Sequence, residues 1–530
     1  MTNRRVHVLS MIAITGIAFF YQLTSPSFGN DHFDHLSKAR QVLHGEYPVR
    51  DFFDPGRPLT IGVSAVALSL SHDTLFGEAM VTMGAIAVGV MLVYWLTRRF
   101  TGSTLWSYWA AGCTLAIEPR LYNYPKVLVC TVALWLIVRY LDAPSAPRAA
   151  CLGAWGAVGF LFRHDLGVYL AIVTITALLS RRSRDAVHPL RAVAIVGITA
   201  AIVAAPYFVY LAQVGALATV AEEGGEGLVS AARVTWRPFV GPGSADPAWL
   251  RYDAENWLYY LFLFSPLVAL GARLSGRVAS SIADHVVALA MLCAALMLFL
   301  IRGNLDSRLP DVAAPSFVLT AWLLATLFES SGERQQRWHW VAATAVLAVA
   351  TITILSVQQL SEWQSARRVV RAIVRLPASL TGPVALLQAD PLDAWEREGT
   401  TDVRGLARWM RSCTAPDDRF LVFGYHPEVF FHARRLFGGG MLFFHAGYFS
   451  SPADQRQTVE RLRHQTAPFV VVEGSVMPAL DGTYAIVGAY VREHYKRVAE
   501  TTFNGPRSFV IFQDNTSVAR PSSTGLPCLL

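Results

Sequence analysis

Residues 30–60 read NDHFDHLSKARQVLHGEYPVRDFFDPGRPLT and form a dense group of charged and histidine side chains. They directly follow the apolar run at residues 7–24, which is long enough to cross the hydrocarbon core of a membrane. Charged groups beside a membrane span are expensive to bury and mark candidate functional positions. The segment therefore predicts a functional loop at a membrane surface.

The composition is that of a polytopic membrane protein. Of 530 residues, 53% are hydrophobic and 16% charged, and the mean hydropathy of +0.37 exceeds that of soluble globular chains. The net charge of +7 does not indicate nucleic-acid binding, because Lys and Arg stand mostly in ones and twos at the ends of apolar runs. Four of the six cysteines lie in apolar runs, and only Cys413 and Cys528 could in principle pair outside the membrane.

About eleven apolar runs predict transmembrane helices. Arg4 and Arg5 precede the first run and no Lys or Arg follows it before Lys38, which predicts a cytoplasmic N-terminus and an uncleaved anchor. An odd number of spans then places the rest of the chain outside the cytoplasm. The runs lie near residues 7–24, 77–97, 104–118, 127–141, 149–162, 167–180, 190–212, 256–272, 283–301, 310–329 and 338–357.

A further apolar run at residues 58–71 is about 14 residues long, a length at which interfacial or re-entrant segments are commoner than spans. Counting it as a span would invert all later loops and place the cationic residues 181–184 outside. We therefore expect it to lie on the outer membrane surface, within a first outer loop at residues 25–76. Arg57, beside Pro58, is expected to fix the turn that leads into this apolar run. Asp51 and Asp54 are expected to fix the same turn.

Residues 359–513 are more polar and alternate between predicted strands and helices. Strands are expected at 419–425, 469–474 and 508–513, and helices at 455–465 and 484–495. The predicted fold is mainly α: a membrane module of residues 1–358 with about 11 transmembrane helices, followed by a small extracytoplasmic α/β domain. The Ser-, Pro- and Gly-rich tail, residues 514–530, is expected to be disordered.

Asp31, Asp34 and His35 have the spacing i, i+3, i+4, which gathers them on one face of a helix with Lys38 one turn further on. A carboxylate in such a place can act as a general base. Ordinary salt bridges in a solvated loop would give the same pattern. A divalent metal held by these three residues is also possible, although no fourth ligand is in view and no cofactor is certain.

Other charged residues stand at the outer turns between predicted spans, where they are candidate substrate-binding groups. A guanidinium there can hold a phosphate by two parallel hydrogen bonds. Snorkelling of Lys126 and Arg302 to lipid headgroups is the structural alternative, and a local Arg163–Asp165 pair is another. The candidates are Glu118, Lys126, Arg163, Asp165 and Arg302.

The first outer loop resembles that of the bacterial GT-C glycosyltransferases, the group of protein O-mannosyltransferases and lipid A aminoarabinose transferases. The matching parts are the acidic motif and helix at residues 31–40, HGEYP at 44–48 and RDFFDPGRPLT at 50–60. The resemblance implies that Asp31 fills the place of the family's catalytic acidic residue. The family's usual Asp-Glu pair reads Asp31-His32 here, so Asp34 could supply the second carboxylate, and Glu118 corresponds to a further family acid only by topology.

The resemblance implies transfer of a sugar, with inversion, from a polyprenyl-phosphate donor to a lipid, glycan or protein acceptor at the outer face of a bacterial inner membrane. Asp31 is then the general base, and Glu118 and Asp34 are further catalytic candidates. Arg57, Lys126, Arg163, Asp165 and Arg302 are the residues expected to hold the donor. A transporter or flippase, or a surface-glycan ligase or polymerase, remains an alternative.

Overall fold

The computed structural model divides into two compact units: a helical unit, Met1–Ser27 and Ala79–Pro383, and an α/β unit, Phe28–Glu78 and Val384–Leu530. Arg302, a predicted donor-binding residue, lies outside the described residues. The structure describes residues 2–24, 26, 28–54, 56–180, 188–218, 220, 236–241, 248–300, 305–329, 344–353, 376–394, 401–445, 447–522 and 525–529.

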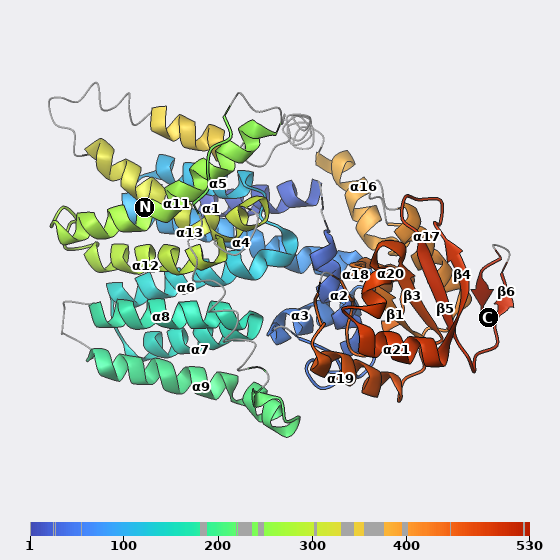
Figure 1. Cartoon of the computed structure of the whole chain (residues 1–530). Helices are drawn as coiled ribbons and strands as arrows, with labels where there is room; N and C mark the ends of the chain where they lie inside the picture. Colours follow the sequence, from blue (N-terminus) through green and yellow to red (C-terminus); the bar gives the residue numbers. More distant parts are fainter. Residues whose placement is uncertain are drawn as a thin grey trace. The chain divides into compact units, whose positions relative to one another are not determined.

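Each predicted span falls, where the structure describes it, on a helix (Figure 1). Seven of the described helices are long and apolar enough to cross a membrane, and α5, α7 and α8 are shorter. The helices are α1 (Thr2–Thr24), α4 (Leu75–Thr101), α5 (Thr104–Ala116), α6 (Tyr124–Asp142), α7 (Ala146–Phe162), α8 (His164–Ser180), α9 (Pro189–Gln213), α11 (Trp249–Leu274), α12 (Ala283–Leu300) and α13 (Leu305–Glu329), with the 3-10 turn η1 (Leu121–Asn123) and a helix at Thr344–Thr353.

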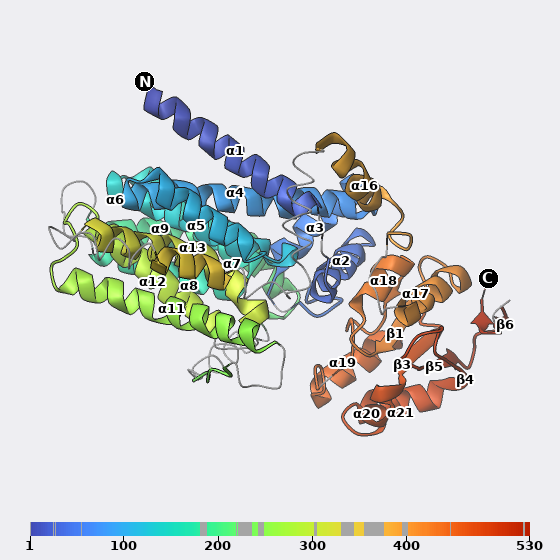
Figure 2. The same cartoon turned by 90° about the horizontal axis from the view of Figure 1, so that it is seen from above.

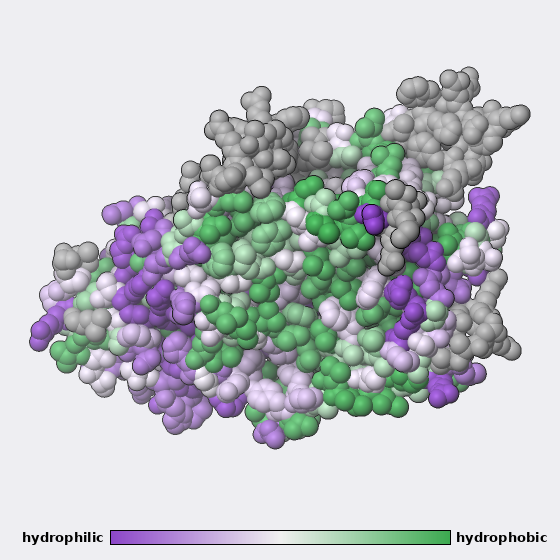
Figure 3. All heavy atoms as spheres, turned by 180° about the vertical axis from the view of Figure 1, so that it is seen from behind, coloured by the Kyte–Doolittle hydropathy of each residue, from purple (hydrophilic) through white to green (hydrophobic). Residues whose placement is uncertain are grey.

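The centre of the helical unit is formed by α12 and α13, which contact α5, α6, α8 and α11 (Figure 2). Most of their side chains are buried, whereas α9 packs on α7 and α8 and exposes apolar side chains such as Leu190, Ile198 and Ile202. Figure 3 shows that apolar residues dominate the visible face of this unit. A contiguous apolar surface of this extent is suited to lipid and not to water.

At one end of the bundle, Asp142 accepts hydrogen bonds from Arg99, at 2.5 Å, and from His285 Nε2, at 3.0 Å. These residues come from the C-terminal ends of α4 and α6 and the first turn of α12. The arrangement requires α4 and α6 to run in one direction and α12 in the other. It agrees with the alternating direction that the predicted spans impose on these helices.

The α/β unit contains a five-stranded sheet of order β2-β1-β3-β5-β4, in which β1 is parallel to β2 and β3, and β5 is antiparallel to β3 and β4. Strands β1, β3 and β5 and helices α19 and α21 lie where the sequence predicts them. The elements are α2 (Asn30–Leu43), α3 (Pro58–Leu70), α16 (Leu376–Gln388, which crosses the unit boundary), α17 (Thr401–Cys413), β1 (Arg419–Phe423), α18 (Pro427–Ala433), β2 (Leu436–Phe437), α19 (Pro452–Leu462), β3 (Phe469–Glu473), η3 (Gly474–Val476), α20 (Met477–Asp481), α21 (Ala485–His494), β4 (Tyr495–Thr501) and β5 (Phe509–Asp514).

Alternate side chains of the buried strands point to opposite faces of this sheet. One face packs on α19, α20 and α21 through residues such as Leu462, Leu480 and Val487. The other face packs on α17, whose Trp409 ring contacts the rings of Phe420 and Phe469 at 5.9 and 5.1 Å. The sheet is therefore the middle of three layers, as Figure 1 shows for this unit.

Helix α2 belongs to the α/β unit, although its Gln41 is 396 residues away in sequence from Phe437 of strand β2, to which it is hydrogen-bonded. Ser37 Oγ donates to the carbonyl of Pro427 at 2.8 Å, and Gln41 Nε2 donates to that of Phe437 at 2.9 Å. This differs from the predicted division, which placed the loop at residues 25–76 with the membrane module. Local sequence signals a helix but not the distant partner against which the helix packs.

Helix α3 covers the apolar run predicted to lie at the membrane surface. It has 13 residues, too few to cross a hydrocarbon core. Val66 and Leu70 are 60% and 78% exposed, and α4, the next candidate span, begins only five residues after Leu70. These features agree with an interfacial position, which stays a prediction.

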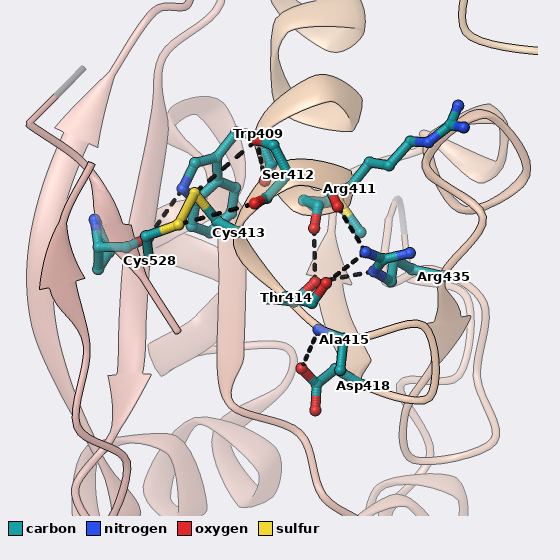
Figure 4. Close-up of a disulfide and its surroundings, with 11 residues drawn as sticks. Trp409, Arg411, Ser412, Cys413, Thr414, Ala415, Asp418, Arg435 and Cys528 are labelled. Carbon is teal, nitrogen blue, oxygen red and sulfur yellow. Dashed lines mark hydrogen bonds between the residues drawn. A yellow bond between two sulfur atoms is a disulfide. The ribbon is translucent and has the colours of Figure 1, made fainter. Parts of the chain in front are cut away.

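The C-terminal tail is ordered over residues 514–522 and 525–529, contrary to the disorder expected from its composition. Strand β6 (Arg520–Pro521) pairs with β7 (Pro527–Cys528), and Trp409 Nε1 donates to the carbonyl of Pro527 at 3.0 Å. A disulfide joins Cys413 at the end of α17 to Cys528 (Figure 4). The cross-link and the pairing compensate the conformational entropy that a polar tail alone could not offset.

Replacement of both Cys413 and Cys528 by Ser should lower the stability of the α/β unit by about 2–4 kcal/mol, because the disulfide closes a long loop of the unfolded chain. The unfolding midpoint of purified protein in urea measures this. Cys151→Ser, at an exposed free cysteine of the helical unit, is the control and should change little. Rapid alkylation of Cys413 and Cys528 in unreduced, folded protein would contradict the pairing.

Candidate functional site

Asp31 lies in the first turn of α2 with an exposed side chain, where the helix dipole favours a negative charge. Tyr425 Oη donates a hydrogen bond to Asp31 Oδ1 at 2.5 Å. Burial and the charge of Asp31 raise the pKa of Tyr425, so its hydroxyl stays protonated and remains a donor. One carboxylate oxygen is thus fixed by a phenol while the carboxylate stays accessible, which is the geometry of an oriented base.

Tyr425 is positioned by the sheet of the α/β unit. It comes two residues after the end of β1, and its ring packs edge-on against Phe443 with the ring centroids 4.7 Å apart. Asp34 and Glu428 contribute further to the raised pKa of Tyr425, after burial and Asp31. The structure therefore joins Asp31 to a tyrosine that sequence reasoning did not identify.

Asp34 is half-buried and pairs with Lys38, with 2.9 Å between Asp34 Oδ1 and Lys38 Nζ. One turn of helix separates the two residues, as their spacing predicts. Arg57 Nη1 donates to His35 Nε2 at 2.8 Å, so this ring nitrogen is unprotonated and His35 is neutral in this arrangement. Arg57 is thereby held against α2, at the start of α3.

The turn before α3 is built by the two aspartates that the sequence assigns to it. The backbone N–H of Arg57 donates to Asp54 Oδ1 at 2.9 Å, and that of Tyr47 donates to Asp51 Oδ2 at 2.8 Å. Asp54 is buried, and burial raises the pKa of its carboxyl group. Both side chains cap local backbone and neither is placed as a base.

A metal held by Asp31, Asp34 and His35 does not fit the structure. Their side chains turn to three different partners, Tyr425, Lys38 and Arg57. Across the described residues, no three His, Cys, Asp or Glu side chains are grouped so that they could hold a metal ion. We therefore derive no step of a reaction through a metal.

His32 occupies the place where the resemblance expects a second acid beside Asp31. Its ring is fully buried, and Nε2 donates to Glu78 Oε1 at 2.9 Å. Ser64 Oγ donates to the same oxygen at 3.2 Å. Glu78 in the first turn of α4 thus connects His32 of α2 to Ser64 of α3, and His32 has a structural role.

The helical unit gathers a second group of charged residues where several helices begin or end. Lys126 at the start of α6 pairs with Asp311 in α13, and both side chains are at most 1% exposed. Arg163, between α7 and α8, pairs with Asp165 at 2.8 Å. Both cations lie over the ring of Phe299 near the end of α12, at 5.0 and 5.4 Å from its centroid.

Arg308 extends this group, because its Nη1 lies 3.8 Å from Asp311 Oδ2 while 37% of its side chain stays exposed. Three cations and two carboxylates thus meet at one end of the bundle. They come from the turns that the sequence places on the outer side, opposite to the end marked by Asp142. Sequence reasoning selected Lys126, Arg163 and Asp165 but missed Asp311, whose position next to Pro310 inside an apolar helix was the available signal.

Glu118 lies between α5 and η1, and Tyr21 Oη at the end of α1 donates to its Oε1 at 2.9 Å. Its backbone has φ of 53°, a left-handed conformation that is uncommon for a glutamate and concentrates at functional sites. Glu118 is also half-buried. Its conformation and position keep it a candidate catalytic residue in the helical unit. Its predicted catalytic role stays a prediction.

The chain was compared with known proteins. No protein-family model matches it, and no curated protein sequence matches it significantly.

Proposed function

We propose that this protein is a membrane glycosyltransferase of the GT-C type, with eleven spans, that transfers a sugar from a polyprenyl-phosphate donor to an acceptor outside the cytoplasm. The observation that carries the proposal is the cluster of Lys126, Arg163 and Arg308 with Asp165 and Asp311. Its cations outnumber its carboxylates at one end of an apolar bundle. Such an excess of fixed positive charge suits a lipid phosphate whose negative charge grows as the sugar leaves.

In the proposed reaction, Asp31 takes the proton of an acceptor hydroxyl. The acceptor oxygen attacks the anomeric carbon while the bond from that carbon to the phosphate oxygen breaks, and the lipid phosphate leaves with the electron pair. Attack from the opposite face inverts the anomeric configuration. The base contributes a factor of about 10²–10⁴ to the rate, and the guanidinium of Arg308 is exposed enough to contact the leaving phosphate.

The proposal places both the N-terminal loop and the C-terminal domain outside the cytoplasm of a bacterial inner membrane. The Cys413–Cys528 disulfide supports this, because structural disulfides persist in oxidising compartments and are rare in the cytosol. The cationic N-terminus supports a cytoplasmic start of the first span. The fact that residues 28–78 and 384–530 fold as one unit also requires both segments to be on the same side.

Native mass spectrometry of protein purified in mild detergent tests the donor class. A polyprenyl phosphate or its sugar ester should remain bound to the unmodified protein, and Arg308→Gln should reduce its occupancy about tenfold, because a charge-assisted hydrogen bond is lost. Arg191→Gln is the matched control, since Arg191 is an exposed arginine in the first turn of α9. Absence of any polyprenyl phosphate, together with transport of a solute by reconstituted protein, would favour a transporter instead.

Tyr425→Phe should lower transfer about tenfold at neutral pH, because one oxygen of Asp31 is no longer held in place. The phenol donates to the carboxylate of Asp31, and a hydrogen bond to a charged group contributes about 1.5–3 kcal/mol. Tyr448→Phe, at an exposed tyrosine of the same unit, should not change the rate. A loss of rate that is matched by an equal loss of folded protein would assign Tyr425 a merely structural role.

A further inference from the structure

The α/β unit contains a cluster of arginines that the proposed reaction does not use. Arg40 in α2 lies over the ring of Phe431 in α18, 5.4 Å from its centroid. Burial, and after it the charges of Arg434 at the end of α18 and of Arg411 in α17, lower the pKa of Arg40. Asp390 and Asp73 are the acidic residues of the group. Arg411 and Arg434 share Asp390, with 2.8 Å from Arg411 Nη2 and 3.3 Å from Arg434 Nη2 to its Oδ2.

Arg40 is the most deeply buried arginine of this cluster and is only 2% exposed. Its Nε and Nη2 donate no hydrogen bond to any described residue, because Asp73 Oδ1 lies 3.5 Å away without accepting one. Arg434 Nε is buried and lacks an acceptor in the same way. Buried guanidinium donors without acceptors are costly and require an explanation.

Arg435 shows how the same fold satisfies a buried guanidinium when the role is structural. Its Nε donates to Thr414 Oγ1 at 2.9 Å, and its Nη2 donates to the carbonyls of Arg411, at 2.6 Å, and Thr414 (Figure 4). No comparable set of acceptors surrounds Arg40 within the described part of the chain. The vacant donors of Arg40 and Arg434, with three arginines against two aspartates, match the needs of an added anion with several acceptor oxygens.

We propose that the cluster of Arg40, Arg411 and Arg434 binds a phosphate group. Phosphate offers the planar guanidinium a bidentate acceptor and would satisfy Nε and Nη2 of Arg40 together. Asp73 stands two residues before α4, the candidate span that begins at Leu75. Through its ion pair with Asp73, Arg40 is therefore close to the start of a candidate membrane span. At such a place phosphate is present both in lipid headgroups and in the surrounding water.

Binding is tested on the full-length protein in mixed micelles, by titration with phosphatidylglycerol, phosphatidylcholine or inorganic phosphate while the unfolding temperature is followed. Saturable stabilisation by phosphatidylglycerol but not by inorganic phosphate identifies a lipid headgroup as the ligand. Stabilisation by inorganic phosphate alone identifies a soluble phosphate group. Arg40→Gln and Arg434→Gln should each lower the affinity for the ligand that stabilises the unmodified protein at least tenfold.

Arg408→Gln is the matched control, because Arg408 is an exposed arginine of the same helix α17 and should change the affinity less than twofold. If Arg40→Gln does not fold, Arg434→Gln decides the question, since a third of the Arg434 side chain is exposed. The proposal is overturned if neither phosphatidylglycerol nor inorganic phosphate binds saturably, or if the one that binds the unmodified protein binds Arg434→Gln with equal affinity.

Discussion

Asp31→Asn should reduce sugar transfer at least about 10²-fold while the protein still folds and binds its donor. The amide has nearly the shape of the carboxylate and can still accept the hydrogen bond from Tyr425 Oη, but it cannot take a proton at neutral pH. Because only the transition state needs the base, turnover should fall without a matching loss of donor binding. Transfer of labelled sugar by reconstituted protein, with donor occupancy from native mass spectrometry, measures both quantities.

Asp51→Asn is the control for this substitution, because Asp51 accepts from the backbone of Tyr47 and from Arg50 within its own turn. Near-normal transfer by Asp31→Asn, with loss in Asp34→Asn or Glu118→Gln, would reassign the base but leave the enzyme class standing. Full activity of all three variants would contradict the transferase interpretation of the loop.

The sequence predicts the helices of this protein well because each apolar run carries its own signal. Length and hydropathy locate the ends of α4, α6 and α12 within a few residues. Strands β1 and β3 are also found, since they are buried on both faces and therefore continuously apolar. Strand β4 is missed, because its alternation is weak and most of its residues are exposed or half-buried.

The partners of the candidate residues could not be predicted, because they are distant in sequence. The spacing of Asp34 and Lys38 predicts their pairing, since one helical turn brings them together. No local pattern links Asp31 to Tyr425, 394 residues away, or Lys126 to Asp311, 185 residues away. Residues 31, 57, 126 and 163 stand out by charge next to apolar runs, but their grouping is decided by tertiary packing.

Lys126→Met should destabilise the helical unit by about 3–5 kcal/mol. The ammonium and the carboxylate of Asp311 are both buried, and removal of one member of a buried ion pair leaves the other charge without compensation. Arg308, 3.8 Å from Asp311, offsets part of this loss, so the lower end of the range is expected. The midpoint of thermal unfolding in detergent measures the change.

The double variant Lys126→Met with Asp311→Leu separates stability from function. Apolar residues of similar volume replace a buried ion pair at little cost, so the double variant should regain most of the stability lost by the single one. If Lys126 also supplies charge to the donor phosphate, transfer and polyprenyl-phosphate occupancy should stay low in the double variant despite its recovered stability. Recovery of transfer together with stability would instead show that this pair only holds α6 to α13, and that Arg163 and Arg308 are the cations that act on the substrate.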